Sequence, residues 1–265
     1  MIEEKTAQNQ QNLTIEMQNS STDIANILGK SEQTLKTEFY QFKVKQLMNR
    51  VGIFINSAQS QKEIQDKLVQ AHMVGVQEVL VSPFYYSIVK GFKSKLSKDI
   101  KYCVAVDFPL GETTSKQKVI GVKEACKKGA DYVFCTMPKD CLKLACFSEE
   151  KKKILRGRRA SKKPFGLVIG GDIEQESLQK ILKNTDGINT NAIVIEGIGV
   201  DVNKLQESLL TANTYKGKRK VYALTDISST ENLSKLISCS VDKIYTPFAH
   251  LLGKQLIEDG PNIIN

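Results

Sequence analysis

The sequence has no long hydrophobic run, no secretion signal and no paired-cysteine motif, and each absence excludes a class of protein. No apolar stretch in the 265 residues approaches the roughly 18 to 20 residues that a membrane-spanning helix needs. The first ten residues, MIEEKTAQNQ, lack the basic segment followed by an apolar one that marks a secretory signal. Their two early glutamates argue against an organellar transit peptide. We therefore expect a cytoplasmic protein.

Cysteine and histidine are too few and too scattered for a metal site. The six cysteines form no CxxC pair, and the only histidines are His72 and His250. This spacing does not suit zinc. Scattered thiols in a chain of this length are typical of reduced, mostly buried side chains in the cytosol. We expect no metal and no cofactor.

The composition divides the chain into two parts. Residues 1–42 are rich in Gln, Asn, Ser and Thr and carry few apolar side chains, as disordered tails do. An alternative is that scattered apolar residues, such as Ile24 and Leu28, anchor this extension on a partner. The chain as a whole is 41% hydrophobic and 25% charged, enough to bury a substantial core. We expect a polar extension over 1–42 and a folded domain over 43–265.

Apolar runs alternate with helix-period segments throughout the folded part. The runs cover residues 51–56, 77–82, 101–108, 131–137, 165–171, 191–198, 220–225 and 242–246. Short, nearly continuous apolar strands separated by helices indicate a parallel sheet covered by helices. Eight such units predict an α/β fold, a closed (β/α)8 TIM barrel. An open, doubly wound sheet is the alternative, but the glycine fingerprint of dinucleotide-binding sheets is missing after the first run.

One stretch, VAVDFPLGETTSKQKVIGVKEACKKGADYV at 104–133, carries a recognisable pattern. It has Phe-Pro-Leu-Gly at 108–111, two threonines at 113–114 and Gly-Ala-Asp at 129–131, and VLVSP at 79–83 supports it. The stretch resembles the deoxyribose-phosphate aldolase family, whose members are TIM barrels. The resemblance implies a Schiff-base lysine in strand six, a second lysine in strand seven and an aspartate in strand four.

Carried over by position, these three roles fall on apolar residues. The aspartate corresponds to Phe134, the Schiff-base lysine to Ile195 and the second lysine to Leu224. The family's glycine pair after strand seven, whose backbone helps hold phosphate, is replaced by DISST at 226–230. Buried ionisable groups cost stability unless they are paired, whereas apolar ones stabilise a core. We therefore expect no catalytic residue at these positions and a filled, dry barrel mouth.

An alternative is that the Schiff-base chemistry is retained but uses residues at other positions. Lys139, just beyond strand four, is the best substitute nucleophile by location, with Glu196 or Asp226 as its carboxylate partner. Strand alternation turns Glu196 away from the side that Ile195 faces, which weakens its case. His250 near a helix start and the glycines of VIGGD at 168–172 are weak signals for anion binding.

The net charge of +9 is concentrated in one segment. Residues 139–163 contain ten Lys and Arg against three Asp and Glu. This predicts docking to an acidic partner through Lys151, Lys152, Lys153, Arg156, Arg158, Arg159, Lys162 and Lys163. A second basic run, 216–220, is expected on the opposite barrel face. Nucleic acid is not favoured, because the segment lacks aromatic residues for base stacking. RRAS at 158–161 also has the form of a kinase site on Ser161.

Two functions follow from these observations. The expected one is a catalytically inactive aldolase-like protein that serves as a structural or binding subunit of a larger assembly, such as the cytoskeleton. The alternative is an active carbon–carbon lyase of the deoxyribose-phosphate aldolase type with a relocated Schiff-base lysine.

Overall fold

The computed structural model describes residues 32–55, 60–96, 99–139 and 147–259. Residues 1–31 of the predicted polar extension, 1–42, lie outside the described residues. The first described element is helix α2, Glu32–Met48, which runs across the predicted boundary at residue 42. Its buried residues Tyr40, Val44 and Met48 join the core of the barrel domain. The Tyr40 hydroxyl donates to the Leu256 carbonyl of the last helix.

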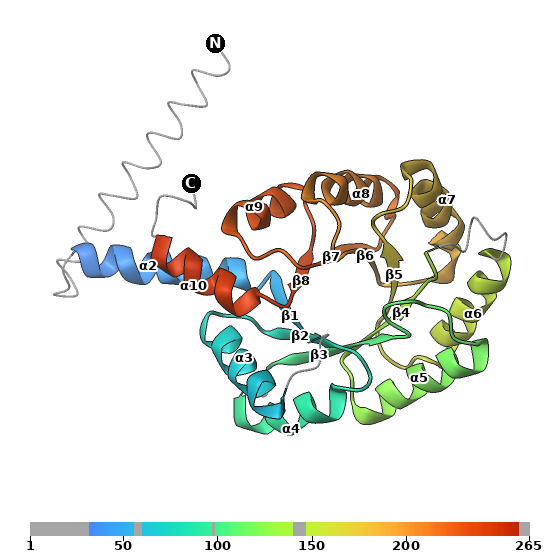
Figure 1. Ribbon diagram of the computed structural model, residues 1–265, viewed down its shortest axis with the longest axis horizontal. Coiled ribbons are helices and arrows are strands. Elements are labelled where there is room, and N and C mark those ends of the chain that lie inside the picture. The colour runs from blue at the N-terminus through green and yellow to red at the C-terminus, as the bar shows by residue number, and fades with distance from the viewer. Residues whose placement is uncertain (1–31, 56–59, 97–98, 140–146, 260–265) are drawn as a thin grey trace, which may run out of the picture.

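The core is a closed barrel of parallel strands (Figure 1). Each strand pairs with the next along the chain, and the last pairs with the first, where Val51 lies beside Ile244. The predicted (β/α)8 TIM barrel is therefore confirmed and the open sheet is excluded. The strands are β1 Val51–Ile55, β2 Glu78–Val81, β3 Lys101–Val106, β4 Tyr132–Thr136, β5 Phe165–Gly170, β6 Ala192–Gly197, β7 Lys220–Thr225 and β8 Lys243–Thr246.

Helices follow the strands and form the outer ring in Figure 1. They are α3 Gln61–Met73, α4 Tyr86–Leu96, α5 Ser115–Lys128, α6 Phe147–Ala160, α7 Gln175–Thr185, the short 3-10 helix η1 Asp186–Ile188, α8 Val202–Tyr215, α9 Thr230–Ser238 and α10 Ala249–Asp259.

Helix α5 shows how local sequence sets these boundaries. Thr114 accepts from the backbone N–H of Gln117, and the Gln117 side chain accepts from the N–H of Thr114, which is a capping box. The helix ends at Gly129, whose φ of 96° is a conformation that glycine adopts without strain. The residues that carried the family resemblance thus fix the start and the end of this helix.

Aromatic rings fill the inside of the barrel. Phe134 packs edge-on to Tyr222 and Tyr245, with ring centroids 6.0 and 6.2 Å apart. The Phe134 ring lies over Gly166, where an added Cβ would come within 2.6 Å of it. Tyr245 lies over Gly52 in the same way, at 2.4 Å. Large rings in the lumen therefore depend on glycines in the neighbouring strands.

A buried carboxylate closes the N-terminal end of the lumen. Glu78, at the start of β2, forms an ion pair of 2.7 Å with Lys243, at the start of β8. It also accepts hydrogen bonds from the Tyr245 hydroxyl and, over 3.0 Å, from the Cys103 thiol. Burial alone would raise the pKa of this carboxyl, but Lys243 and the hydrogen bonds outweigh burial and lower it.

This lowered pKa predicts a pH-dependent stability. A carboxyl whose pKa is depressed by folding stabilises the native state above its ordinary pKa, 4.5, and that contribution is lost as the pH falls through the folded value. Glu78→Gln should cost about 2 kcal/mol at pH 7. The variant should also lose less stability than the wild type between pH 7 and pH 3. Urea unfolding at both pH values measures this, and an equal loss in the two proteins would contradict it.

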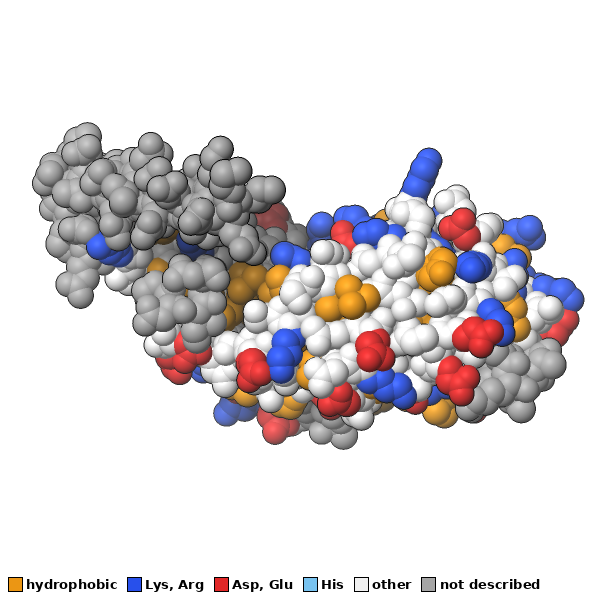
Figure 2. Space-filling view, turned by 90° about the horizontal axis from the view of Figure 1, so that it is seen from above, with side chains coloured by type: hydrophobic (Ala, Val, Ile, Leu, Met, Phe, Trp, Pro, Cys, Tyr) orange, Lys and Arg blue, Asp and Glu red, His pale blue; other side chains and the backbone are white. Residues whose placement is uncertain are grey.

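The surface is rich in charge of both signs. In the side view of Figure 2, Lys and Arg side chains line the upper rim, whereas most Asp and Glu side chains lie in the lower half. Over the described part of the chain, no helix combines the length and the apolar character that crossing a membrane requires.

Candidate active site

A lysine and two carboxylates meet at the C-terminal ends of three neighbouring strands. Lys139 follows β4, Asp172 follows β5, and Glu196 lies near the end of β6. The Lys139 Nζ is 3.5 Å from an oxygen of Asp172 and 3.4 Å from an oxygen of Glu196. The C-terminal end of a TIM barrel is where active sites of this fold form. We refer to these three residues as the lysine–carboxylate cluster.

Glu196 points toward the barrel mouth and is held rigidly. Its side chain is only 8% exposed. One carboxylate oxygen accepts from the backbone N–H of Ile198 over 3.0 Å, and the other faces Lys139. Because one oxygen is fixed by the backbone, the second has a defined position next to the amine.

The Lys139 side chain lies over a glycine of the next strand. A Cβ added at Gly170 would come within 3.1 Å of the Lys139 Cγ and 3.0 Å of an Asp172 oxygen. Glycine therefore gives the lysine stem room to cross from β4 toward β5 and β6. The Lys139 side chain remains 43% exposed and is accessible from solvent.

The carboxylates control the charge of this amine. Partial burial would lower the pKa of Lys139, but Glu196 and then Asp172 raise it above the ordinary value. The resting side chain is therefore an ammonium ion. As a nucleophile it must first give up a proton, and both carboxylates lie close enough to affect that step.

A buried ion cluster supports the strand end that leads to Lys139. The fully buried Lys118 of α5 contacts Asp107 at 2.7 Å and Glu150 at 2.9 Å. It also donates to the carbonyls of Gly111, at 2.6 Å, and Thr136, at 2.8 Å. This single ammonium therefore ties the Phe-Pro-Leu-Gly turn, the end of β4 and the start of α6 together.

The turn itself rests on the same strand end. Gly111 has a φ of 73°, and a Cβ there would lie 2.6 Å from the Met137 carbonyl carbon and 2.7 Å from the Pro138 nitrogen. The backbone just before Lys139 is thus in direct contact with a turn in which no larger residue would fit.

The structure separates the three positions that the resemblance assigned to catalysis. Phe134 and Leu224 lie in the lumen, as expected. Ile195 does not, because it belongs to the cluster between the barrel and the helices, beside Gly171. The expectation that three apolar side chains converge in the mouth is therefore wrong at strand six. The inward side chain there is Glu196, and the argument from alternation against Glu196 rested on the misplaced Ile195.

Of the substitute residues, the structure brings together Lys139 and Glu196 but not Asp226. Asp226 is exposed at the end of β7, and its carboxylate accepts from the backbone N–H of Gly199 over 3.2 Å. Asp172 was missed, although its position at the exit of β5, directly after VIGG, is the kind of signal that could have identified it.

The two weaker candidates, His250 for anion binding and Ser161 for phosphorylation, lie in surroundings that do not suit these roles. His250 is buried at the start of α10, and burial, followed by Lys67 and Lys254, lowers its pKa, so it is a poor binder of anions. Ser161 is buried, and its hydroxyl donates to the Lys163 carbonyl over 2.9 Å. It is therefore not presented to a kinase in this conformation.

The predicted partner-binding cations are spread over both ends of α6. Lys152 and Lys153, near its start, form ion pairs of 2.7 and 3.1 Å with Glu149 and Glu150. Arg158, near its end, donates to the Asn189 carbonyl that precedes β6. The later residues of the segment therefore lie at the same barrel end as residues 216–220, which also precede a strand. The expectation that the two basic runs lie on opposite faces is wrong for these residues.

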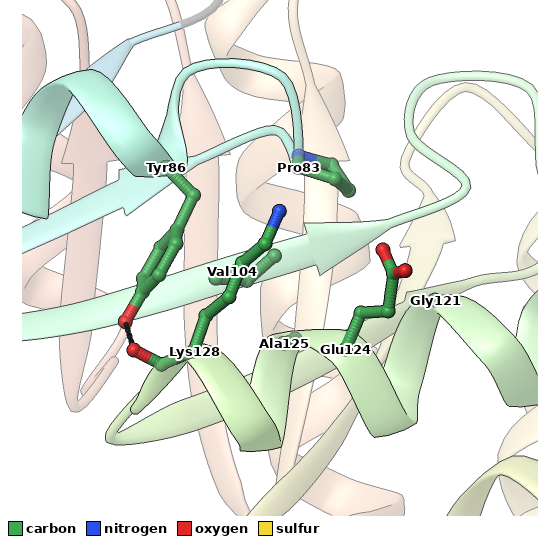
Figure 3. Close-up of a pocket in the computed structure, with 7 residues that line it drawn as sticks. All are labelled: Pro83, Tyr86, Val104, Gly121, Glu124, Ala125 and Lys128. Carbon is green, nitrogen blue, oxygen red and sulfur yellow. Dashed lines mark hydrogen bonds between the residues drawn. The ribbon is translucent and has the colours of Figure 1, made fainter.

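A second hollow lies away from this cluster. Figure 3 shows a shallow pocket between β3 and helices α4 and α5, lined by Pro83, Tyr86, Val104, Gly121, Glu124, Ala125 and Lys128. The Tyr86 hydroxyl crosses it to donate to the Lys128 carbonyl over 2.7 Å. It lies outside the barrel, between the sheet and the helices, and not at the barrel mouth. Elsewhere in the described residues, no group of three His, Cys, Asp or Glu side chains could hold a metal ion.

Comparison with known proteins finds relatives that are named deoxyribose-phosphate aldolases. No family model matches the chain. The chain is 26% identical over 207 residues to the deoxyribose-phosphate aldolase of Aquifex aeolicus, covering 75% of this chain and 90% of the relative. It is 27% identical over 201 residues to that of Mycoplasmoides gallisepticum, covering 74% and 87%. A 72-residue stretch is 39% identical to that of Streptococcus pneumoniae strain CGSP14, covering 27% and 32%.

Solved structures share the fold at lower identity. The aldolase QR15 has a TM-score of 0.69 at 18% identity, covering 80% of this chain and 96% of that one. A putative deoxyribose-phosphate aldolase from Coccidioides immitis has a TM-score of 0.68 at 15% identity, covering 80% and 86%. Together with the sequence relatives, these support the resemblance drawn from residues 104–133.

The relatives contradict the expected function. Proteins similar over about three quarters of the chain are named as aldolases, and nothing in the comparisons supports a catalytically inactive structural subunit. The expectations of a pseudoenzyme and of a cytoskeletal association are therefore wrong, and the enzymatic alternative fits better.

Proposed function

We propose that this chain is an active carbon–carbon lyase of the deoxyribose-phosphate aldolase type, with Lys139 as its Schiff-base lysine. The observation that carries the proposal is the lysine–carboxylate cluster at the barrel mouth. Phe134 and Leu224 cannot replace ionisable groups, so the chemistry has to come from other side chains at this end of the barrel. Lys139 is partly exposed, so an aldehyde can reach its amine, and two carboxylates lie close enough to take part in the proton transfers.

The reaction can be written with the groups at hand. The neutral Lys139 amine attacks the aldehyde carbon of an open-chain 2-deoxyribose phosphate, a C–N bond forms and water leaves to give an iminium ion. A carboxylate takes the proton of the β-hydroxyl, the bond between the second and third carbons breaks, and its electron pair moves toward the iminium nitrogen. The third carbon leaves as the aldehyde of a three-carbon phosphate. The remaining two-carbon enamine gains a proton and is hydrolysed by water, which releases acetaldehyde and frees Lys139.

Glu196 is the better proton acceptor of the two carboxylates. It is nearly buried and one of its oxygens is fixed by the Ile198 N–H, so the other is preorganised toward the amine. Asp172 is 44% exposed, and no backbone N–H in the described part of the chain anchors its carboxylate. We assign the proton transfer to Glu196, and to Asp172 the role of setting the charge of Lys139.

The raised pKa of Lys139 predicts how activity depends on pH. Because only the neutral amine attacks, kcat/KM for 2-deoxyribose 5-phosphate should rise with pH, about tenfold per unit while the pH stays below the pKa of Lys139. Asp172→Asn removes a carboxylate that raises this pKa. The rising limb of the variant should therefore shift to lower pH, with higher kcat/KM at neutral pH than in the wild type. A coupled assay of aldehyde release across pH measures it.

A matched variant makes the pH profile decisive. Glu176→Gln removes an exposed carboxylate of α7 that pairs with Lys180 at 3.0 Å and has no contact with Lys139. It should leave the profile unchanged. Glu196→Gln should shift the limb in the same direction as Asp172→Asn but lower the plateau, because the proton acceptor is lost. If Asp172→Asn leaves the limb in place, Lys139 is not the titrating nucleophile.

A further inference from the structure

The N-terminal end of the barrel carries a strong excess of positive charge over half of its ring. Between the end of α5 and the start of β7, ten lysine and arginine side chains lie on loops and helix ends that precede strands. They are Lys127, Lys128, Arg158, Arg159, Lys162, Lys163, Lys183, Lys216, Lys218 and Lys220. We call this set the basic face. In Figure 1 the helices concerned, α5 to α8, lie next to one another around one half of the ring.

The carboxylates at this end do not neutralise these ten cations. Asp186 pairs over 3.4 Å with the buried Arg219. Asp131 accepts from the backbone N–H of Tyr102 over 2.9 Å. Asp131, just before β4, and Asp186, just after α7, are thus engaged by groups outside the basic face.

The internal contacts of the basic face leave its charge uncompensated. Arg158 donates to the Asn189 carbonyl, the Lys216 Nζ donates to the Asn213 side chain over 2.9 Å, and the Lys183 Nζ lies 4.9 Å from the Tyr215 ring centroid. All three acceptors are neutral. Within the described residues, none of the ten cations forms an ion pair. Seven of the ten side chains are exposed, namely Lys127, Lys128, Arg159, Lys162, Lys183, Lys218 and Lys220.

The composition of this face selects among anionic partners. Eight of its ten cations are lysines, and none of the large exposed apolar side chains in the described chain lies on it. A protein interface is depleted in lysine and has aromatic anchors at its centre. Single-stranded nucleic acid is held by base stacking on aromatic rings. Binding to the phosphates of a duplex requires cations but no aromatic side chains. Contacts with the nucleic-acid backbone supply position and affinity without reading the base sequence.

The shape of the charged area also suits a duplex. The cations are densest along the arc from α5 to β7; on the other half of the ring, Lys45, Arg50 and Lys101 lie farther apart along this end, and Lys243 is paired with Glu78. A rod-shaped polyanion meets such a strip with its phosphates, whereas a flat lipid surface would contact the entire end. We propose that the basic face binds double-stranded nucleic acid through its phosphates, without sequence preference. This site lies at the opposite barrel end from the lysine–carboxylate cluster and does not depend on the proposed lyase activity.

The test measures binding of the full chain to a labelled 25-base-pair DNA duplex by fluorescence anisotropy at several salt concentrations. A fourfold variant carries Arg159→Gln, Lys162→Gln, Lys163→Gln and Lys218→Gln. With four phosphate contacts removed, the slope of log K against log salt should become shallower by about 3 to 4. Binding at low salt should weaken at least tenfold, and duplexes of unrelated sequence should bind alike.

The control keeps the overall charge of that variant but leaves the basic face intact. It carries Lys62→Gln, Lys116→Gln, Lys123→Gln and Lys254→Gln, four exposed lysines elsewhere. This control should bind nearly as the wild type does. Equal weakening in both variants would mean that only net charge matters and would overturn the assignment. The absence of duplex binding at low salt would overturn it too, as would tighter binding to phosphatidylserine vesicles or to polyglutamate. Lyase activity should be unchanged in both variants.

Discussion

Replacing Lys139 with methionine should lower kcat/KM for aldol cleavage by about 10⁴-fold or more, because methionine keeps the apolar stem but has no amine to form the iminium ion. The fold should not change, since the Lys139 side chain is 43% exposed, its contact with Asp172 is a surface ion pair of small net value, and the nearly buried Glu196 keeps its hydrogen bond from the Ile198 N–H. Aldehyde release under saturating and limiting substrate, together with a melting curve, measures both parts.

A second lysine of the barrel mouth makes this result specific. Lys204 donates to the Asp172 backbone carbonyl over 2.9 Å and is the neighbouring amine that could act instead. Lys204→Met should keep most of the activity. If Lys204→Met loses the activity and Lys139→Met retains it, the nucleophile is Lys204 and the assignment of Lys139 is wrong.

Replacing Lys118 with methionine should destabilise the protein by about 3 to 5 kcal/mol. Lys118 is fully buried, and its ammonium is the cation that Asp107 and Glu150 share. Without it, the Asp107 carboxylate and one Glu150 oxygen stay in a dry site, and the Gly111 and Thr136 carbonyls lose their donor. Urea unfolding followed by circular dichroism measures the change.

Two further variants separate this cause from a loss of helix packing. Lys116→Met lies two residues away on the exposed side of α5 and should change the stability by less than about 0.5 kcal/mol. Adding Glu150→Gln to Lys118→Met should restore part of the loss, because one of the unpaired charges is removed. A Lys118→Met variant as stable as Lys116→Met would show that the buried cluster contributes no net stability.

The barrel could be predicted from sequence because its strands are buried on both faces. Each of the predicted apolar runs contains one observed strand, for example 165–171 with Phe165–Gly170. Burial on both faces also means that the sequence does not show which residues of β6 point into the barrel. All six of its residues are buried, so the pattern of apolar residues does not show which side faces the lumen. The assignment of Ile195 to the mouth slipped by one residue for that reason.

The candidate site could be predicted only in part. Lys139 and Glu196 were found because each lies near a predicted strand end, but Asp172 becomes their neighbour only when β5 is paired between β4 and β6. The basic segment posed the opposite problem. It was treated as one surface, although α6 carries the chain from one end of the barrel to the other and divides the segment between them.

The most direct test of the account is chemical trapping of the nucleophile. The full chain is incubated with acetaldehyde and sodium borohydride, digested and mapped by mass spectrometry. The proposed chemistry predicts one ethyl group per chain, located on Lys139, with none gained by the Lys139→Met variant under the same conditions. A chain that gains no adduct, or one that gains it on another lysine while Lys139 stays unmodified, would contradict the proposed site.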